Sequence, residues 1–150
     1  MLANVFCLLL AAAAPCGLTV ENRVDPQGVD VPAPRLSWKG AAEAGETNVV
    51  QTAWRILVAS SEAKLAADAG DLWDSGKVAC GDSRFVRYAG APLRTSRHCF
   101  WKVRTWDGAD RPSAWSRTAE WLTGVMPPAG WKAKWIAPAK ETQPENALDA

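Results

Sequence analysis

The chain has 150 residues, which is enough for one domain of ordinary size with tails. Lysine and arginine number 17 against 16 aspartates and glutamates, and the net charge is +1. We therefore expect no nucleic-acid partner, because such a chain carries no strong field of either sign. Nine tryptophans against one tyrosine and three phenylalanines indicate a structure built on large apolar rings.

Residues 1–16 are predicted to be a secretory signal peptide. They carry no charge, and an apolar run from residue 5 to residue 10 leads into four alanines. The run is too short for a stable membrane span, which needs about 20 apolar residues. We therefore expect a secreted or periplasmic protein. The alternative is a lipoprotein signal ending at Cys16, but Pro15 and Ala13 match a lipid-attachment site poorly.

Residues 17–124 are predicted to form an all-β domain, an immunoglobulin-like β-sandwich of about seven strands with one short helix. Apolar and polar residues alternate over short stretches, and clusters of Pro, Gly, Asp and Ser separate these stretches. The predicted strands are 18–22, 35–39, 51–60, 71–78, 84–88, 99–106 and 115–122.

The strongest predicted strand is 51–60, with Trp54, Ile56 and Val58 on one face. A helix over 62–68 should follow it, because this segment contains good helix formers after two candidate capping serines, Ser60 and Ser61.

Residues 125–150 are predicted to be a linker followed by the truncated start of a further domain. The sequence Pro127-Pro128-Ala129-Gly130 is typical of an interdomain linker, and 131–136 begins like a new structured element. We expect the natural polypeptide to continue beyond Ala150.

Several motifs carry a family resemblance. Leu36-Ser37-Trp38, 54–58 and Ala114-Trp115-Ser116 resemble strands of a fibronectin type III domain. A fuller series resembles, in the same order, the N-terminal region of bacterial α-L-rhamnosidases. The segments of this series are 22–30, 34–38, 51–53, 71–78, 101–104 and 131–136. One departure is Cys99-Phe100, which stands where the fold usually has a corner tyrosine.

The resemblance implies a non-catalytic module of an enzyme that cleaves terminal α-L-rhamnose with inversion. The acidic pair of such enzymes lies in a downstream (α/α)6 barrel, and no residue of this sequence corresponds to it. The resemblance therefore implies no catalytic residue and no enzyme activity for this chain alone. It also implies that the downstream domains of the same polypeptide are its partners.

The residue types also bear on three other kinds of site: a catalytic carboxylate pair, a metal site and a disulfide. The pairs Asp71/Asp74 and Asp107/Asp110 could supply two carboxylates, but turn contexts favour a structural role for all four. No cofactor is expected, and one histidine, His98, with two mature cysteines supplies too few ligands for zinc. Cys80 and Cys99 could form a disulfide or remain two separate thiols.

The tryptophans divide into core and surface candidates. Trp38, Trp54, Trp101 and Trp115 are assigned to the sandwich core. Sugar or domain contacts are predicted for Trp106, Trp121, Trp131 and Trp135. Arg104 and Arg117 are near Trp106 and Trp121 and could stack on them instead. The alternative function is therefore a carbohydrate-binding module that uses exposed tryptophans to bind rhamnose-containing glycans.

Overall fold

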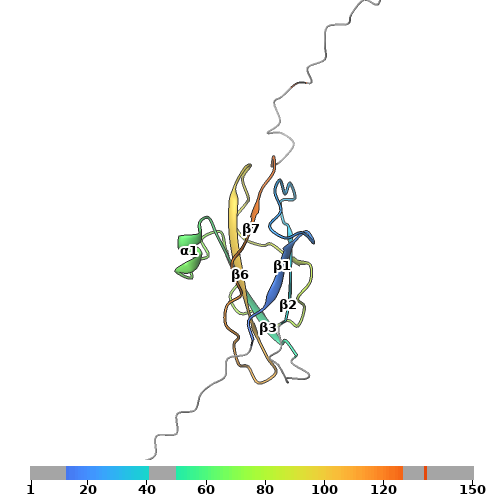
Figure 1. The fold of residues 1–150 in the computed structure, drawn as a ribbon, viewed down its shortest axis with the longest axis vertical. Helices are drawn as coiled ribbons and strands as arrows, with labels where there is room; N and C mark the ends of the chain where they lie inside the picture. The colour runs from blue at the N-terminus through green and yellow to red at the C-terminus, as the bar shows by residue number, and fades with distance from the viewer. Residues whose placement is uncertain (1–12, 41–49, 127–133, 135–150) are drawn as a thin grey trace, which may run out of the picture.

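Two antiparallel sheets face each other around the buried rings. The structure is a computed structural model, and it describes residues 13–40, 50–126 and 134. The three-stranded sheet has the order β1 (Cys16–Val20), β2 (Arg35–Lys39), β5 (Val86–Arg87). The four-stranded sheet has the order β4 (Trp73–Asp74), β3 (Ala53–Ala59), β6 (His98–Trp106), β7 (Ala119–Leu122). The short helix α1 (Glu62–Ala66) lies beside the four-stranded sheet (Figure 1). The predicted β-sandwich with one helix is confirmed.

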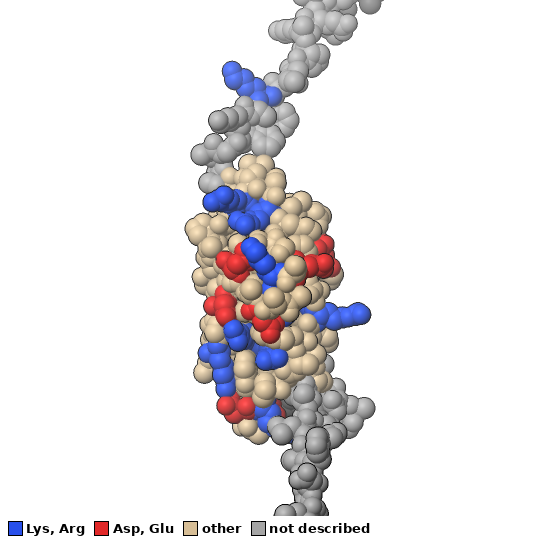
Figure 2. Space-filling view, turned by 90° about the vertical axis from the view of Figure 1, so that its left-hand side faces the viewer, with Lys and Arg blue, Asp and Glu red and all other residues tan. Residues whose placement is uncertain are grey.

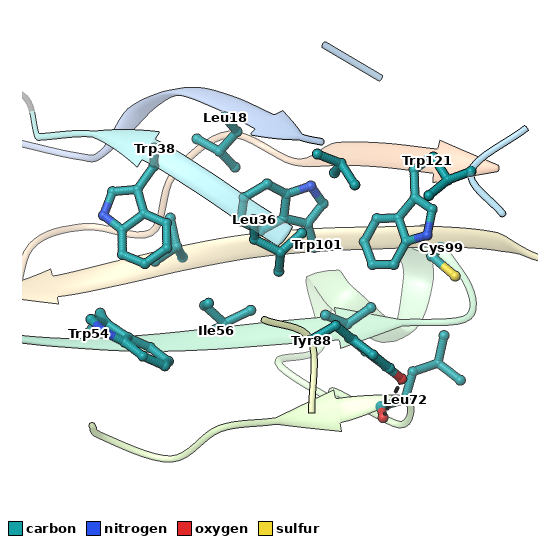
Figure 3. Close-up of a cluster of buried hydrophobic side chains, with 14 residues drawn as sticks. Leu18, Leu36, Trp38, Trp54, Ile56, Leu72, Tyr88, Cys99, Trp101 and Trp121 are labelled. Carbon is teal, nitrogen blue, oxygen red and sulfur yellow. Dashed lines mark hydrogen bonds between the residues drawn. The ribbon is translucent and has the colours of Figure 1, made fainter. Parts of the chain in front are cut away.

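The core is filled by the alternate side chains that the sequence pattern predicts. Trp54, Ile56 and Val58 of β3 all face inward and are buried, as expected. Trp101 of β6 is completely buried, and Figure 3 shows it among the inward side chains of both sheets. Each large apolar side chain buried in this way contributes about 1.5–3 kcal/mol. Tryptophan burial is therefore a principal source of the stability of this domain.

The first strand begins earlier than predicted. β1 starts at Cys16 and Pro15 is already buried, so the strand overlaps the segment assigned to the signal peptide. The strand ends at Val20 and not at Asn22. Glu21 and Asn22 have φ of 48° and 62°, which places them in a turn that cannot continue an extended strand. Residues 1–12 lie outside the described residues.

Helix α1 is capped by Ser61. The Ser61 side chain accepts a hydrogen bond from the N–H of Lys64. The helix ends at Ala66, two residues before its predicted end, and Asp68 has φ of 56°. Leu65 anchors it, because this side chain is buried against Leu57 of β3 on the outer face of the four-stranded sheet.

The predicted strand 115–122 is broken. β7 pairs with β6 only at residues 98–101 of β6, and an irregular segment follows the next part of β6. Two serine hydroxyls replace the missing strand there. Ser116 Oγ accepts the N–H of Val103 at 3.0 Å, and Ser113 Oγ accepts the N–H of Thr105 at 3.1 Å. The edge of β6 is therefore covered without a regular ladder.

The single tyrosine closes one side of the sandwich. Tyr88 is buried, and its hydroxyl donates to the carbonyl of Ala91 at 2.7 Å and lies 3.1 Å from the carbonyl of Leu72. Burial raises the pKa of Tyr88 to about 12. Gly90 is required here, because a Cβ would stand 2.2 Å from the carbonyl oxygen of Leu72. The chain thus has a buried tyrosine anchor, although Cys99 and Phe100 occupy the usual corner position.

The two cysteines that were considered for a disulfide, Cys80 and Cys99, are free thiols. Cys80 is half-buried, and Cys99 is completely buried among apolar side chains. Burial raises the pKa of the Cys99 thiol to about 11. Cys99 therefore behaves as a small core residue.

Candidate functional site

The aspartate pairs considered as catalytic candidates are engaged in structural contacts. Asp74 binds Arg55 with both oxygens and accepts the N–H of Gly76, and the Arg55 hydrogen bond lowers its pKa. Asp71 accepts the N–H and hydroxyl of Ser60 and pairs with Lys64 at 2.7 Å. Ser60 was the other serine that could have capped helix α1, but it binds Asp71 instead.

The second pair is likewise held in turn geometry. Asp107 accepts the N–H groups of Ala109 and Arg111, each at 2.9 Å, and backbone hydrogen bonds lower its pKa. Asp110 pairs with Lys77 across the turn. Each of the four carboxylates therefore has a partner in a turn or in an ion pair. Among the described residues, no group of His, Cys, Asp and Glu could hold a metal ion.

His98 lies at the exposed start of β6, where its Nε2 is 3.0 Å from Glu120. No helix within the described ranges is long and apolar enough to cross a bilayer.

Of the four tryptophans predicted as surface contacts, the structure describes Trp106 and Trp121, and these two do not share a site. Trp121 is completely buried and packs edge-on against Tyr88 at 6.3 Å, so it cannot contact a ligand or a neighbouring domain. This expectation was wrong. Trp106 is half-buried, and the ammonium of Lys77, not Arg104, lies 5.0 Å from its ring centre. Trp131 and Trp135 lie outside the described residues.

Trp115, assigned to the core, lies instead on the outer face of the four-stranded sheet. It is half-buried beneath cations: Arg104 Cζ lies 4.5 Å and Lys102 Nζ 4.9 Å from its ring centre. Lys102 also pairs with Asp68, whose pKa is lowered by that hydrogen bond. Figure 2 shows basic and acidic side chains interspersed on the face that includes α1. These contacts indicate a self-paired surface and not a vacant aromatic platform.

The most constrained feature at the edge of the domain is the segment that follows β7, which we name the exit clamp (residues 123–126). On one side, residues 26–29 run parallel to it. Val29 forms a parallel bridge with Thr123, and the Gly124 N–H donates to the carbonyl of Val29 at 2.8 Å. Figure 1 shows this segment at the end of the sandwich, beyond β7.

The other side of the exit clamp is held by residues 94–97. Thr123 is buried, and its hydroxyl accepts the N–H of Arg97 at 2.7 Å and donates to the carbonyl of Arg94 at 2.5 Å. The Thr95 hydroxyl accepts the N–H of Met126 at 3.0 Å, and Met126 is itself buried. The chain is therefore fixed up to Met126, two residues beyond the predicted end of the domain.

Sequence reasoning missed the exit clamp because its partners are distant in the chain. The segment 26–29 reads as a Pro- and Gly-containing loop, and nothing local indicates that it pairs with residues 122–124. The only sequence signal is the pair of threonines, Thr95 and Thr123, at the ends of otherwise ordinary segments.

Comparisons with known proteins agree on one family. The family model of the Rha78A-like, N-terminal immunoglobulin domain matches residues 15–127. The α-L-rhamnosidase of Streptomyces avermitilis is 45% identical over 126 residues, which cover 83% of this chain and 12% of that protein. The chain spans about one eighth of the length of the curated relatives that it matches.

The solved structures that are similar to this chain include α-L-rhamnosidases as well. The α-L-rhamnosidase from Dictyoglumus thermophilum is similar with a TM-score of 0.80 and 38% identity, over 85% of this chain and 14% of that one. The Streptomyces avermitilis α-L-rhamnosidase complexed with L-rhamnose gives a TM-score of 0.75 and 42% identity, over 83% and 12%. In each case the match is confined to a small part of the larger protein.

Proposed function

We propose that this chain, which belongs to the family of Rha78A-like N-terminal immunoglobulin domains, fixes the direction in which the polypeptide continues after Met126. It is a non-catalytic domain of a glycoside hydrolase. The parent protein would be a secreted α-L-rhamnosidase that releases terminal α-L-rhamnose. Its export would depend on residues 1–16.

The observation that carries this proposal is the exit clamp. A flexible linker would begin at the last strand residue, but here Thr123, Gly124 and Met126, three of the next four residues, are hydrogen-bonded to segments on two sides. A domain attached directly after such a segment has fewer orientations available to it, because its first residues cannot rotate freely. The sandwich would therefore act as a rigid base for the following domains.

Trp131 and Trp135 would contribute by packing against the next domain. They follow Met126 by five and nine residues in the sequence, so they could contact the next domain close to the exit clamp. The partners of this chain would then be downstream parts of its own polypeptide.

Carbohydrate binding by exposed tryptophans gains no support from the seven tryptophans within the described residues. Four are buried and three are half-buried beneath or beside other side chains. A flat sugar-binding platform needs an open ring face.

The test is a pair of chimeras in which this chain replaces the matching domain of the Streptomyces relative. A four-residue Gly-Ser insertion after Met126 should broaden the small-angle scattering profile and lower the melting temperature of the downstream domains. The matched control places the same insertion after Gly108, in an exposed turn at the other end of β6. Identical profiles for the two insertions would contradict an orienting role, and rhamnoside hydrolysis by this chain alone would contradict the non-catalytic assignment.

A further inference from the structure

The outer face of the three-stranded sheet carries a hollow that the orienting role does not use. It has a volume of about 510 Å³ and crosses β1, β2 and the segment before β5. We name it the Phe85 hollow, and its principal lining residues are Gly17, Thr19, Ser37, Lys39, Arg84 and Phe85.

The floor of the Phe85 hollow is made of small side chains with hydroxyl groups. Thr19 and Ser37 are paired across β1 and β2. Gly17 has φ of 58°, and a Cβ there would stand 3.2 Å from Cδ of Lys39. The lysine stem therefore lies over the glycine. Because Thr19 and Ser37 are small side chains, a flat ligand could approach the sheet at this point and meet their hydroxyl groups.

Phe85 stands in the hollow in an unusual backbone conformation. Its side chain is 50% exposed, and its φ is 57°. Among the described non-glycine residues with positive φ, it is the single large apolar one. Such a conformation is unfavourable for a bulky residue and persists only where its surroundings enforce it.

Two contacts enforce the conformation of Phe85. Ser37 Oγ accepts its N–H at 3.0 Å, and the guanidinium of Arg35 lies 5.3 Å from its ring centre. Arg35 is fixed in turn by Glu21, which it binds at 2.6 Å. The ring is thus held on the surface by neighbouring side chains.

Among the described residues, the charged side chains that line the hollow are both positive. They are Lys39 and Arg84. Arg87 is opposite Arg35 in the strand register and lines a separate hollow that also includes Glu21. Within the described part of the chain, none of Lys39, Arg84 and Arg87 forms an ion pair. On the outer face of the other sheet, Arg55 and Lys102 are paired with aspartates, and Arg104 lies against the ring of Trp115. The hollow therefore favours an anionic ligand.

We propose that the Phe85 hollow binds an acidic sugar, a hexuronate unit of a polysaccharide. The apolar C–H face of the pyranose would pack on Phe85, its hydroxyls would bond to Thr19 and Ser37, and its carboxylate would face Lys39 and Arg84.

A sugar fits this hollow better than an acidic protein surface. The floor offers hydroxyl groups next to one flat ring, which suits a compact polyhydroxylated ring. In addition, β1 begins and β2 ends at the end of the sandwich opposite the end of β7 (Figure 1), so the hollow is separate from the exit clamp. This site is independent of the orienting role.

The test is a titration of the full chain, followed by two-dimensional NMR, with trigalacturonate, its methyl ester and hexaglutamate as probes. Trigalacturonate should shift the amides of Thr19, Ser37 and Phe85, and added salt should weaken its binding. The methyl ester should bind about tenfold more weakly, because it lacks the carboxylate charge.

Variants separate this site from general charge attraction. Lys39→Met keeps the stem over Gly17 but removes the charge, and Phe85→Asn removes the ring with a residue that tolerates positive φ. Each should weaken trigalacturonate binding about tenfold. The matched control, Lys77→Met on the other sheet, should leave binding unchanged. No shifts in the wild-type chain, equal binding of hexaglutamate, or equal weakening by the control would overturn the proposal.

Discussion

Replacing Thr123 with valine should loosen the exit clamp while preserving side-chain shape. The substitution removes the acceptor of the Arg97 N–H and the donor to the Arg94 carbonyl. Each backbone group left without a partner costs about 1–3 kcal/mol, and the additional buried methyl group recovers about 0.8 kcal/mol. We therefore expect the free energy of unfolding to fall by about 2 kcal/mol. At about 4 °C per kcal/mol for a domain of this size, the melting temperature should fall by about 8 °C.

The assay is thermal unfolding followed by circular dichroism, with urea unfolding for the free energy. The matched control is Thr118→Val, since Thr118 is exposed and lies outside the clamp. Its melting temperature should stay within about 2 °C of the parent, as is usual for surface substitutions. If Thr123→Val behaved like this control, the hydroxyl would not hold the exit and the reasoning would be refuted.

Three further predictions concern other parts of the sandwich. Although burial opposes ionisation of Asp71, hydrogen bonds from Lys64 and Ser60 lower its pKa from 3.8 to about 2. Its stabilisation should be complete above the unfolded value and be lost as the pH falls towards 2; urea unfolding of Asp71→Asn should show less loss over that range, and an equal loss would refute this. Ser116→Ala removes the acceptor of the buried Val103 N–H, so the free energy of unfolding should fall by about 1–2 kcal/mol, and an unchanged urea midpoint would contradict it. Cys80 is half-buried and Cys99 is completely buried, so a thiol reagent followed by mass spectrometry should label Cys80 before Cys99 in the native protein, whereas equal rates would be incompatible with the core.

The core of β3 could be predicted because its pattern is local. Trp54, Ile56 and Val58 alternate with other residues along an unbroken strand, so the period of two alone assigns them to one face. Trp115 was assigned to the core and Trp121 to the surface, and the structure shows the reverse. In one continuous strand these two rings would share a face, but the irregular segment with Ser113 and Ser116 interrupts the alternation. Trp115 then faces outward and Trp121 inward.

Features that depend on contacts between residues far apart in the chain could not be predicted from the sequence. Ser60 and Ser61 are equally able to cap α1, and Asp71 decides between them by binding Ser60. The exit clamp depends on pairing between residues 26–29 and 122–124, which lie far apart in the chain. Positive φ at Phe85 likewise has no local signal, because glycine or asparagine would be expected there.

Amide hydrogen exchange at the exit clamp tests the central claim most directly. The N–H groups of Gly124 and Met126 donate to Val29 and Thr95. If the clamp belongs to the folded sandwich, their exchange should be as slow as that of Val103 in β6 and should require global unfolding. Exchange of both amides at the rate of an unprotected peptide, while Val103 stays protected, would show that the exit is flexible and cannot orient the domains attached after Met126.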